Sequence, residues 1–243
     1  MPEFPGPIRL PGEPPAPREP YETHGRHETP SVVDDDTDVY GAEDAAALLT
    51  ERISQVEPGT ARTAADGRIL LSPTLAPGRD RIAGPVSRAA TLVVFGAHGT
   101  PASRSLAAVL DEIRRTRLTR IGVAWRHYPD PAAHPSAAVL ALAVEAAAVA
   151  GRFWTLTREL LHMRHHEPGD LHSAMIRSAL DPEQTLAAMR RGVGSDRILT
   201  DVESALASGV TFAPTLFIDG ERYDGALRPR DVIAAVDAAA GAA

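Results

Sequence analysis

The chain has 243 residues, of which 44% are hydrophobic and 23% charged, with a formal net charge of −7 and no cysteine. Without thiols it can form no disulfide, thiolate nucleophile or iron–sulfur cluster, and without lysine it can form no Schiff base and no phosphate-binding P-loop. The acidic balance argues against a general binder of nucleic acids or of anionic membranes.

The first 38 residues differ in composition from the rest of the chain. Nine prolines occur within the first thirty residues, and four aspartates follow between positions 34 and 38. Such a stretch cannot build a hydrophobic core, so residues 1–38 are expected to be a disordered tail, with an acidic docking tail as the alternative. No charged start followed by an apolar run is recognised, so the expected location is the cytoplasm.

Residues 39–78 are expected to form an adaptor segment with one helix. Within it, residues 42–57 place apolar side chains at helical spacing, and a Pro-Gly pair ends the pattern. Residues 68–72 could add a short strand, and residues 73–85 are expected to be loop. The sequence leaves open whether this segment packs on the main domain or connects to something else.

From residue 90 onward the pattern is that of an α/β domain. Residues 91–97 form a nearly continuous apolar run, which is typical of a strand buried on both faces. A helix is expected from Pro101 to Arg115, and a second strand over residues 121–127, ended by Pro129. A strand, a helix and a strand at this spacing indicate a βαβ unit with parallel strands.

An all-helical insertion is predicted over about residues 133–208. The expected helices cover residues 136–150, 152–163, 171–180, 182–191 and 195–208. The longest apolar run, residues 137–151, is interrupted by Glu145 and is shorter than the roughly 20 residues that span a bilayer, so no membrane insertion is expected.

The chain ends in a predicted hairpin and a helix. Asp219-Gly220 lies between two short strand-like runs and is a strong signal for a two-residue hairpin turn. A final helix is expected over residues 229–239. The complete order is therefore βαβ, a helical insertion, and ββα.

This order, with the residues at its joints, resembles the DsbA-like branch of the thioredoxin superfamily over residues 79–240. The resemblance is carried, in chain order, by RDRIAGP, TLVVFG, RHYPDPAAHPSAA, GRFW and SGVTFAPTLFIDGERYDG. The chain looks most like the bacterial subgroup in which some members are fused to sodium–proton antiporters. The resemblance implies a thioredoxin-like α/β fold (βαβ–ββα) with a helical insertion, in a domain of residues 79–243.

The resemblance places the family's Cys-Pro-X-Cys site on Thr100-Pro101-Ala102-Ser103. Family chemistry needs the first cysteine as a thiolate, and a hydroxyl cannot form a disulfide. Assistance from the helix dipole, at most ~2 kcal/mol, does not ionise a hydroxyl near neutral pH. The acidic residues that the family places before this site are also absent, because Val94 and Ala97 stand there. Redox activity is therefore expected to be lost.

A second loop is implied to face this motif. The stretch Thr211-Phe212-Ala213-Pro214 matches the family's cis-proline loop, so the Ala213–Pro214 bond is expected to be cis. In the family, the backbone beside this proline pairs with an extended substrate peptide, and that pairing needs no thiol. Phe212 stands where glycine is usual. It could anchor a partner or plug the groove, and we favour the plug because apolar rings beside apolar sites usually pack.

His98 is a further candidate, either as a base for Thr100 or Ser103 or as part of the partner-binding surface with Phe212, Ala213 and Pro214. A triad-like arrangement needs an orienting acid, and the nearby acids are missing. A loop histidine without a catalytic role is therefore favoured.

Two other clusters have simpler interpretations. A histidine-rich stretch contains His162 and His166 at a spacing that metal ligands on one helix face can use, but no carboxylate at a defined spacing completes the set. A solvated cluster is favoured, and no metal is expected. Four arginines between positions 114 and 120 oppose the negative end of the first helix of the βαβ unit, and they need no further function.

Three functional hypotheses follow. The first is a redox-inactive binding or regulatory module that takes a protein or peptide partner in the groove between residues 100–103 and 213–214. The second is a transferase or isomerase that binds glutathione, in which the hydroxyl of Thr100 or Ser103 stabilises the bound thiolate. The third is a structural role for residues 1–57 in a larger assembly. Apart from glutathione no cofactor is expected, and no nucleic-acid partner. The sequence does not name the partner or the oligomeric state.

Overall fold

The computed structural model describes residues 42–85 and 90–242, so the predicted disordered tail lies outside the described residues. The helices are α1 (Glu43–Ser54), α2 (Pro101–Arg104), α3 (Ala107–Thr116), α4 (Ser136–Val149), α5 (Phe153–His162), α6 (Pro168–Arg177), α7 (Pro182–Arg190), α8 (Ser195–Ala207) and α9 (Pro229–Ala242). The strands are β1 (Arg81–Ala83), β2 (Ala90–Gly96), β3 (Ile121–His127), β4 (Thr215–Ile218) and β5 (Glu221–Tyr223).

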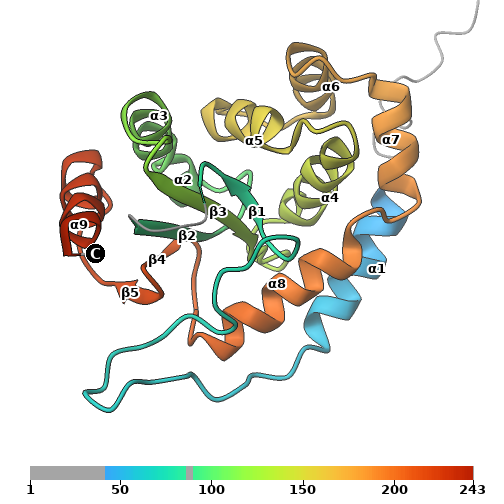
Figure 1. Cartoon of the computed structure of the whole chain (residues 1–243). Helices are drawn as coiled ribbons and strands as arrows, with labels where there is room; N and C mark the ends of the chain where they lie inside the picture. The colour runs from blue at the N-terminus through green and yellow to red at the C-terminus, as the bar shows by residue number, and fades with distance from the viewer. Residues whose placement is uncertain (1–41, 86–89, 243) are drawn as a thin grey trace, which may run out of the picture. The chain divides into compact units, whose positions relative to one another are not determined.

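The strands form one mixed sheet in the order β1-β3-β2-β4-β5 (Figure 1). The two central strands β2 and β3 are parallel, with Val94 opposite Trp125, and every other pair is antiparallel. The parallel pair and its crossover through α2 and α3 confirm the predicted βαβ unit. The hairpin between β4 and β5 turns at Asp219 and Gly220, whose φ angles of 48° and 81° are those that this type of two-residue turn requires.

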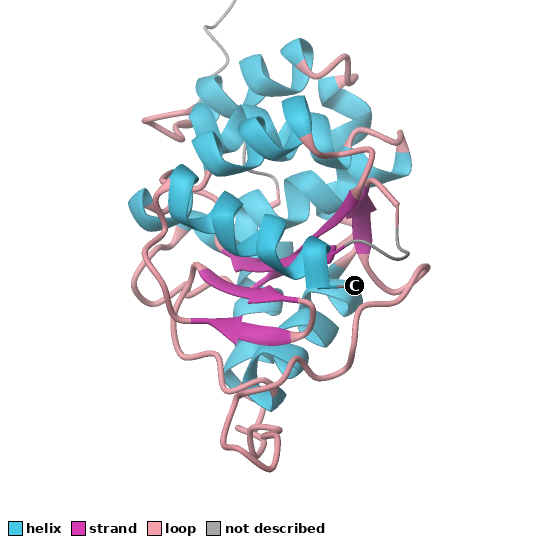
Figure 2. Ribbon diagram, turned by 60° about the vertical axis from the view of Figure 1, so that its left-hand side comes forward, coloured by secondary structure: helices cyan, strands magenta, loops and turns pink. Residues whose placement is uncertain are grey.

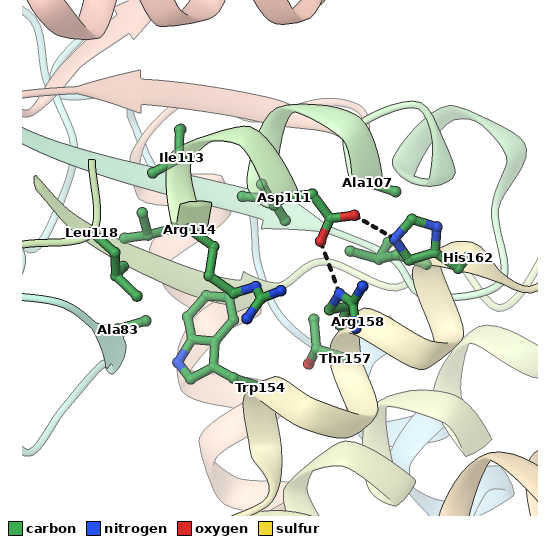
Figure 3. Close-up of a pocket in the computed structure, with 13 residues that line it drawn as sticks. Ala83, Ala107, Asp111, Ile113, Arg114, Leu118, Trp154, Thr157, Arg158 and His162 are labelled. Atoms are coloured by element: carbon green, nitrogen blue, oxygen red, sulfur yellow. Dashed lines mark hydrogen bonds and ion pairs between the residues drawn. The ribbon is translucent and has the colours of Figure 1, made fainter. Parts of the chain in front are cut away.

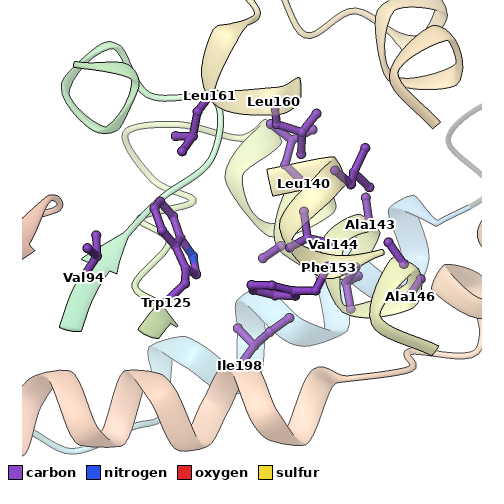
Figure 4. Packing of buried hydrophobic residues seen from close by; sticks show 14 of the residues in the cluster. Val94, Trp125, Leu140, Ala143, Val144, Ala146, Phe153, Leu160, Leu161 and Ile198 are labelled. Carbon is purple, nitrogen blue, oxygen red and sulfur yellow. The ribbon is translucent and has the colours of Figure 1, made fainter. Parts of the chain in front are cut away.

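The apolar run of β2 is explained by helices on both faces of the sheet (Figure 2). Leu92 and Val94 point to the larger core, which α3, α4, α5 and α9 complete, and part of which Figure 4 shows. Val93 and Phe95 point to a smaller core on the other face, which includes Ala205 of α8. Because successive side chains alternate between faces, a strand covered on both sides must be apolar at every position.

The helical insertion is organised around α4. Side chains from Ala137 to Ala147 in this helix are buried, and α5, α7 and α8 pack around it. Glu145 is the charged exception, and its partners are described below. None of the helices among residues 42–85 and 90–242 is long and apolar enough to cross a membrane.

The segment before the sheet packs on the main domain. Helix α1 contacts α4, α7 and α8, and Leu71 belongs to the smaller core. The short strand expected over residues 68–72 is reduced to two isolated bridges, from Ile69 to Thr63 and from Leu70 to Glu221. Pro73 follows directly and has no N–H to continue a ladder.

Three local details differ from the sequence prediction. First, β1 lies within the expected loop 73–85 and pairs with β3 as an edge strand, too short to show an alternating pattern. Second, the helix expected from Pro101 to Arg115 is divided into α2 and α3. At the break the Ser105 hydroxyl donates to the carbonyl of Ala102 at 2.6 Å, and such a bond competes with the helical pattern. Third, Pro168 begins α6, which was expected only from Leu171, because proline is favoured in the first helical position.

Candidate functional site

A groove of about 640 Å³ lies at the end of the sheet where β2 and β3 finish. Its walls are residues 100–102, the loop after β3 from Tyr128 to His134, and residues 211–213. Helices α1 and α8 close the remaining side. The structure therefore brings the predicted motif and the predicted cis-proline loop to the same groove, and it adds α1, which sequence reasoning did not connect with the site.

The two hydroxyls of the motif are both engaged with the backbone. Thr100 is the N-cap of α2: its Oγ1 accepts from the N–H of Ser103 at 3.1 Å and donates to the carbonyl of Ala97 at 3.0 Å. The Ser103 Oγ accepts from the N–H of Ala97 at 3.0 Å, and the Ser103 side chain is fully buried. Both hydroxyls thus connect the start of α2 to Ala97, the residue that follows β2, and each already has an intramolecular hydrogen-bond partner.

Phe212 does not plug the groove. Its side chain is 56% exposed, and the guanidinium of Arg222 lies over the ring, 5.7 Å from the centroid. The interpretation favoured from the sequence is therefore wrong. β4 begins only at Thr215, so Phe212 precedes the sheet and lies at the border of the groove without being packed into it.

The main chain beside Pro214 has unused hydrogen-bonding groups. The bond between Ala213 and Pro214 is cis, and Pro214 itself is buried. Among the hydrogen bonds of the described residues, none uses the backbone N–H or carbonyl of Thr211 or Ala213. Such a free edge can pair with another extended chain.

His98 is not part of the groove surface. The ring is fully buried, 4.5 Å from the Trp125 ring and 5.8 Å from the His127 ring between centroids. Neither ring nitrogen has a hydrogen-bond partner in the described part of the chain. Burial, helped by the nearby His127 and His166, holds the pKa of His98 well below its usual range. Its predicted place among the partner-binding residues is therefore wrong, because the tight turn at Gly99 directs the side chain inward.

Arg126 is a buried cation that sequence reasoning missed. Its guanidinium makes five hydrogen bonds: two to the Asp80 carboxylate at 2.7 and 3.1 Å, one to Ser204 Oγ at 2.8 Å, and one each to the carbonyls of Pro73 and Thr74 at 2.9 and 3.4 Å. Burial would raise the pKa of Asp80, but the bonds from Arg126 and from a backbone N–H outweigh it and lower the pKa.

A second buried ionic group centres on Glu145 of α4. Its carboxylate accepts from Arg81 at 2.5 Å, contacts His127 Nε2 at 3.2 Å and lies 3.7 Å from Arg197. Desolvation opposes ionisation, yet the hydrogen bonds from His127 and Arg81 lower the Glu145 pKa. Asp201 accepts from the His127 backbone N–H at 3.0 Å, and burial raises the Asp201 pKa to about 6. The residues that follow His127 and Asp201 in the chain line the groove, so these ions fix its walls.

The histidine-rich stretch is involved in ordinary pairs. His162 Nε2 lies 2.8 Å from Asp111 Oδ2, and His166 Nε2 lies 3.2 Å from the carbonyl of Leu160. Within residues 42–85 and 90–242, no three side chains of histidine, aspartate or glutamate are arranged to hold a metal ion.

A family model described as thioredoxin matches residues 109–238. Two curated relatives are both named "Na(+)/H(+) antiporter NhaA 1". The relative from Mycolicibacterium gilvum is 34% identical over 198 residues, which are 79% of this chain and 30% of the relative. The relative from Salinispora arenicola is 34% identical over 175 residues, 72% of this chain and 27% of the relative. The chain thus spans less than a third of the length of these relatives.

Two solved structures illustrate the same fold. Alpha-DsbA1 of Wolbachia pipientis superposes with a TM-score of 0.60 at 12% identity, covering 70% of this chain and 94% of that protein. BdbD of Bacillus subtilis superposes with a TM-score of 0.58 at 12% identity, covering 71% of this chain and 98% of that protein. At these identities the likeness concerns the fold alone, and it confirms the DsbA-like architecture expected from the sequence.

Proposed function

The chain belongs to the thioredoxin family, and we propose that it is a redox-inactive member that binds an extended segment of a protein partner in the groove between residues 100–102 and 211–213. The chain holds no cysteine, so thiol–disulfide exchange is excluded by composition. The proposed activity therefore keeps the binding surface of the fold without its redox chemistry.

The observation that carries the proposal is the free main chain of Thr211 and Ala213. These groups border the groove and have no hydrogen-bond partner among the described residues. An extended peptide that adds to this edge would pair with them, and its alternate side chains would enter the groove. Exposed Phe212 supports the same mode, because an aromatic ring at the rim offers a large apolar contact at low entropic cost.

The names of the relatives suggest which partner to test first. The two relatives described above are named sodium–proton antiporters, and this chain matches part of each. A segment of such a transporter is therefore the first candidate for the bound peptide, and the proposed role toward it is regulatory.

The glutathione alternative has less support. It requires a hydroxyl of Thr100 or Ser103 to donate to a bound thiolate, but the Thr100 proton is directed to the carbonyl of Ala97 and Ser103 is fully buried. We therefore favour peptide binding over a transferase or isomerase.

The test uses peptides selected from a random display library on the intact chain, with affinity measured by calorimetry. Ala102→Arg puts a long side chain into the groove, whereas Ala108→Arg makes the same change at an exposed position of α3 outside it. We expect binding to fall at least tenfold in the first variant and to stay within twofold in the second.

A second arm uses the selected peptide with single N-methyl groups. If the main chain of residues 211–213 pairs with the peptide, N-methylation at alternate positions removes a donor and weakens binding, while the positions between them tolerate it. Equal binding by the Ala102→Arg variant, or no effect of any N-methyl group, would contradict the proposal.

A further inference from the structure

A second pocket, of about 150 Å³, lies between α3 and α5 (Figure 3). Its lining comes from Ala107 and Ile113 of α3, Trp154 and Leu161 of α5, and Ala83 of β1. None of its lining residues takes part in the groove described above. It is therefore a separate feature of the molecule, and an inference from it does not depend on the proposed function.

The pocket is apolar and small residues create it. Ala83 and Ala107 stand on two of its sides, where longer side chains would fill the space. An apolar cavity of about 150 Å³ is large enough for one benzene-sized ring.

Four of the lining side chains are titratable, and among the described residues Arg114 alone of these four has no hydrogen-bond or ion-pair partner. Asp111 Oδ1 accepts from Arg158 Nε at 2.8 Å, and Asp111 Oδ2 lies 2.8 Å from His162 Nε2. Burial works to raise the Asp111 pKa, but these two contacts outweigh it and lower the pKa.

Arg114 is different from these neighbours. Across the part of the chain that the structure describes, no hydrogen bond or ion pair engages it. Arg114 is exposed, and Figure 3 shows its guanidinium beside the ring of Trp154. The unpaired charge that lines this apolar cavity is therefore positive.

We propose that this pocket binds a small aromatic carboxylate, with the ring in the cavity and the carboxylate on Arg114. The cavity volume suits a single six-membered ring, and the indole of Trp154 offers an aromatic wall against which such a ring can pack. The planar guanidinium of arginine matches a carboxylate with two parallel hydrogen bonds. A neutral hydrocarbon would fill the cavity but would leave Arg114 without a partner. A non-aromatic anion would pair with Arg114 but would leave the cavity empty.

The experiment titrates the intact chain with benzoate and, separately, with toluene, following the tryptophan fluorescence, to which both Trp125 and Trp154 contribute, and checking by calorimetry. Ala107→Leu should fill the cavity, weaken benzoate binding at least tenfold and leave the melting temperature equal or higher. Ala83→Leu makes the same test from the opposite wall, so that a folding defect in one variant does not decide the result.

Arg114→Gln tests the charged contact, and Arg115→Gln is its matched control. Arg115 is the next residue, exposed, paired with Glu112 and outside the pocket. We expect Arg114→Gln to weaken benzoate about tenfold and toluene less than twofold, and Arg115→Gln to change neither.

Three outcomes would overturn the proposal. They are the absence of saturable benzoate binding to the unmodified chain, benzoate binding that survives both cavity-filling variants, and benzoate binding that Arg114→Gln leaves unchanged. The last outcome would reject the role of Arg114 in holding an anion.

Discussion

Replacing Arg126 with methionine should destabilise this protein by about 3 kcal/mol. Methionine keeps much of the length and the apolar stem of the side chain. The change therefore removes the guanidinium group but leaves the volume of the side chain nearly the same. The guanidinium is fully buried on β3 and donates to Asp80, to Ser204 and to two backbone carbonyls. All five of its N–H donors are used.

The magnitude follows from what remains after the change. Removing one partner of a buried ion pair costs about 3–5 kcal/mol, because the other charge stays buried without compensation. Asp80 keeps two other contacts, Arg79 Nη1 at 2.7 Å and the N–H of Ala76 at 2.8 Å. These place the expected loss at the lower end of the range.

The assay is urea unfolding at pH 7 followed by circular dichroism. Arg115→Met is the control, since the Arg115–Glu112 pair is exposed and should contribute at most about 0.5 kcal/mol. The double variant Asp80→Asn with Arg126→Met should cost about 2 kcal/mol less than the sum of the two single changes. The reason is that Asp80→Asn removes the buried carboxylate charge that Arg126→Met leaves without its partner. A loss below about 1 kcal/mol for Arg126→Met would refute the reasoning.

Three further predictions concern the groove and its surroundings. Ser103→Ala should cost about 1–2 kcal/mol in urea unfolding, because it strands the buried N–H of Ala97, and a neutral result would show that this bond is dispensable. Stability should fall as the pH drops below about 6.5, because His98 then becomes protonated in the unfolded chain but stays neutral in the folded one. The stabilisation that neutral His98 contributes is fully present above that pH. Asp201 acts in the opposite sense, since its raised pKa of about 6 gives stability at low pH that is lost as the pH rises from 3.8 to 6. Comparing His98→Phe with the unmodified chain cancels the Asp201 effect, and equal pH slopes from 7.5 to 5.5 would contradict the assignment to His98. Reduced glutathione should leave the melting temperature unchanged, whereas a saturable rise that disappears in Ser103→Ala would restore the transferase hypothesis.

Much of the fold could be predicted because its signals are local. The run in β2, the crossover helix, the run in β3 and the Asp219-Gly220 turn each show their structure in a few neighbouring residues. The structure confirms the thioredoxin-like fold with a helical insertion that these signals indicate. The strand β1 could not be predicted in this way, because its three residues are specified by pairing with β3, some forty residues later in the chain.

The candidate site was predictable only in part. The resemblance located residues 100–103 and 211–214, and the structure brings them to one groove. It did not show that Phe212 faces outward or that His98 faces inward, since the direction of a side chain depends on the backbone turn that carries it. The contribution of α1 to the groove depends on packing between segments far apart in sequence.

By itself the amino-acid sequence determined what chemistry is absent. A chain without cysteine cannot exchange disulfides, whatever its fold, because that property depends on composition alone. Only the tertiary structure decided how the remaining polar groups are used. The hydroxyls of Thr100 and Ser103 cap backbone groups, and Arg126 meets Asp80 across 46 positions of the chain. The reason is that burial and long-range hydrogen bonding arise when distant segments pack together, and no local pattern of residues encodes which partners will meet.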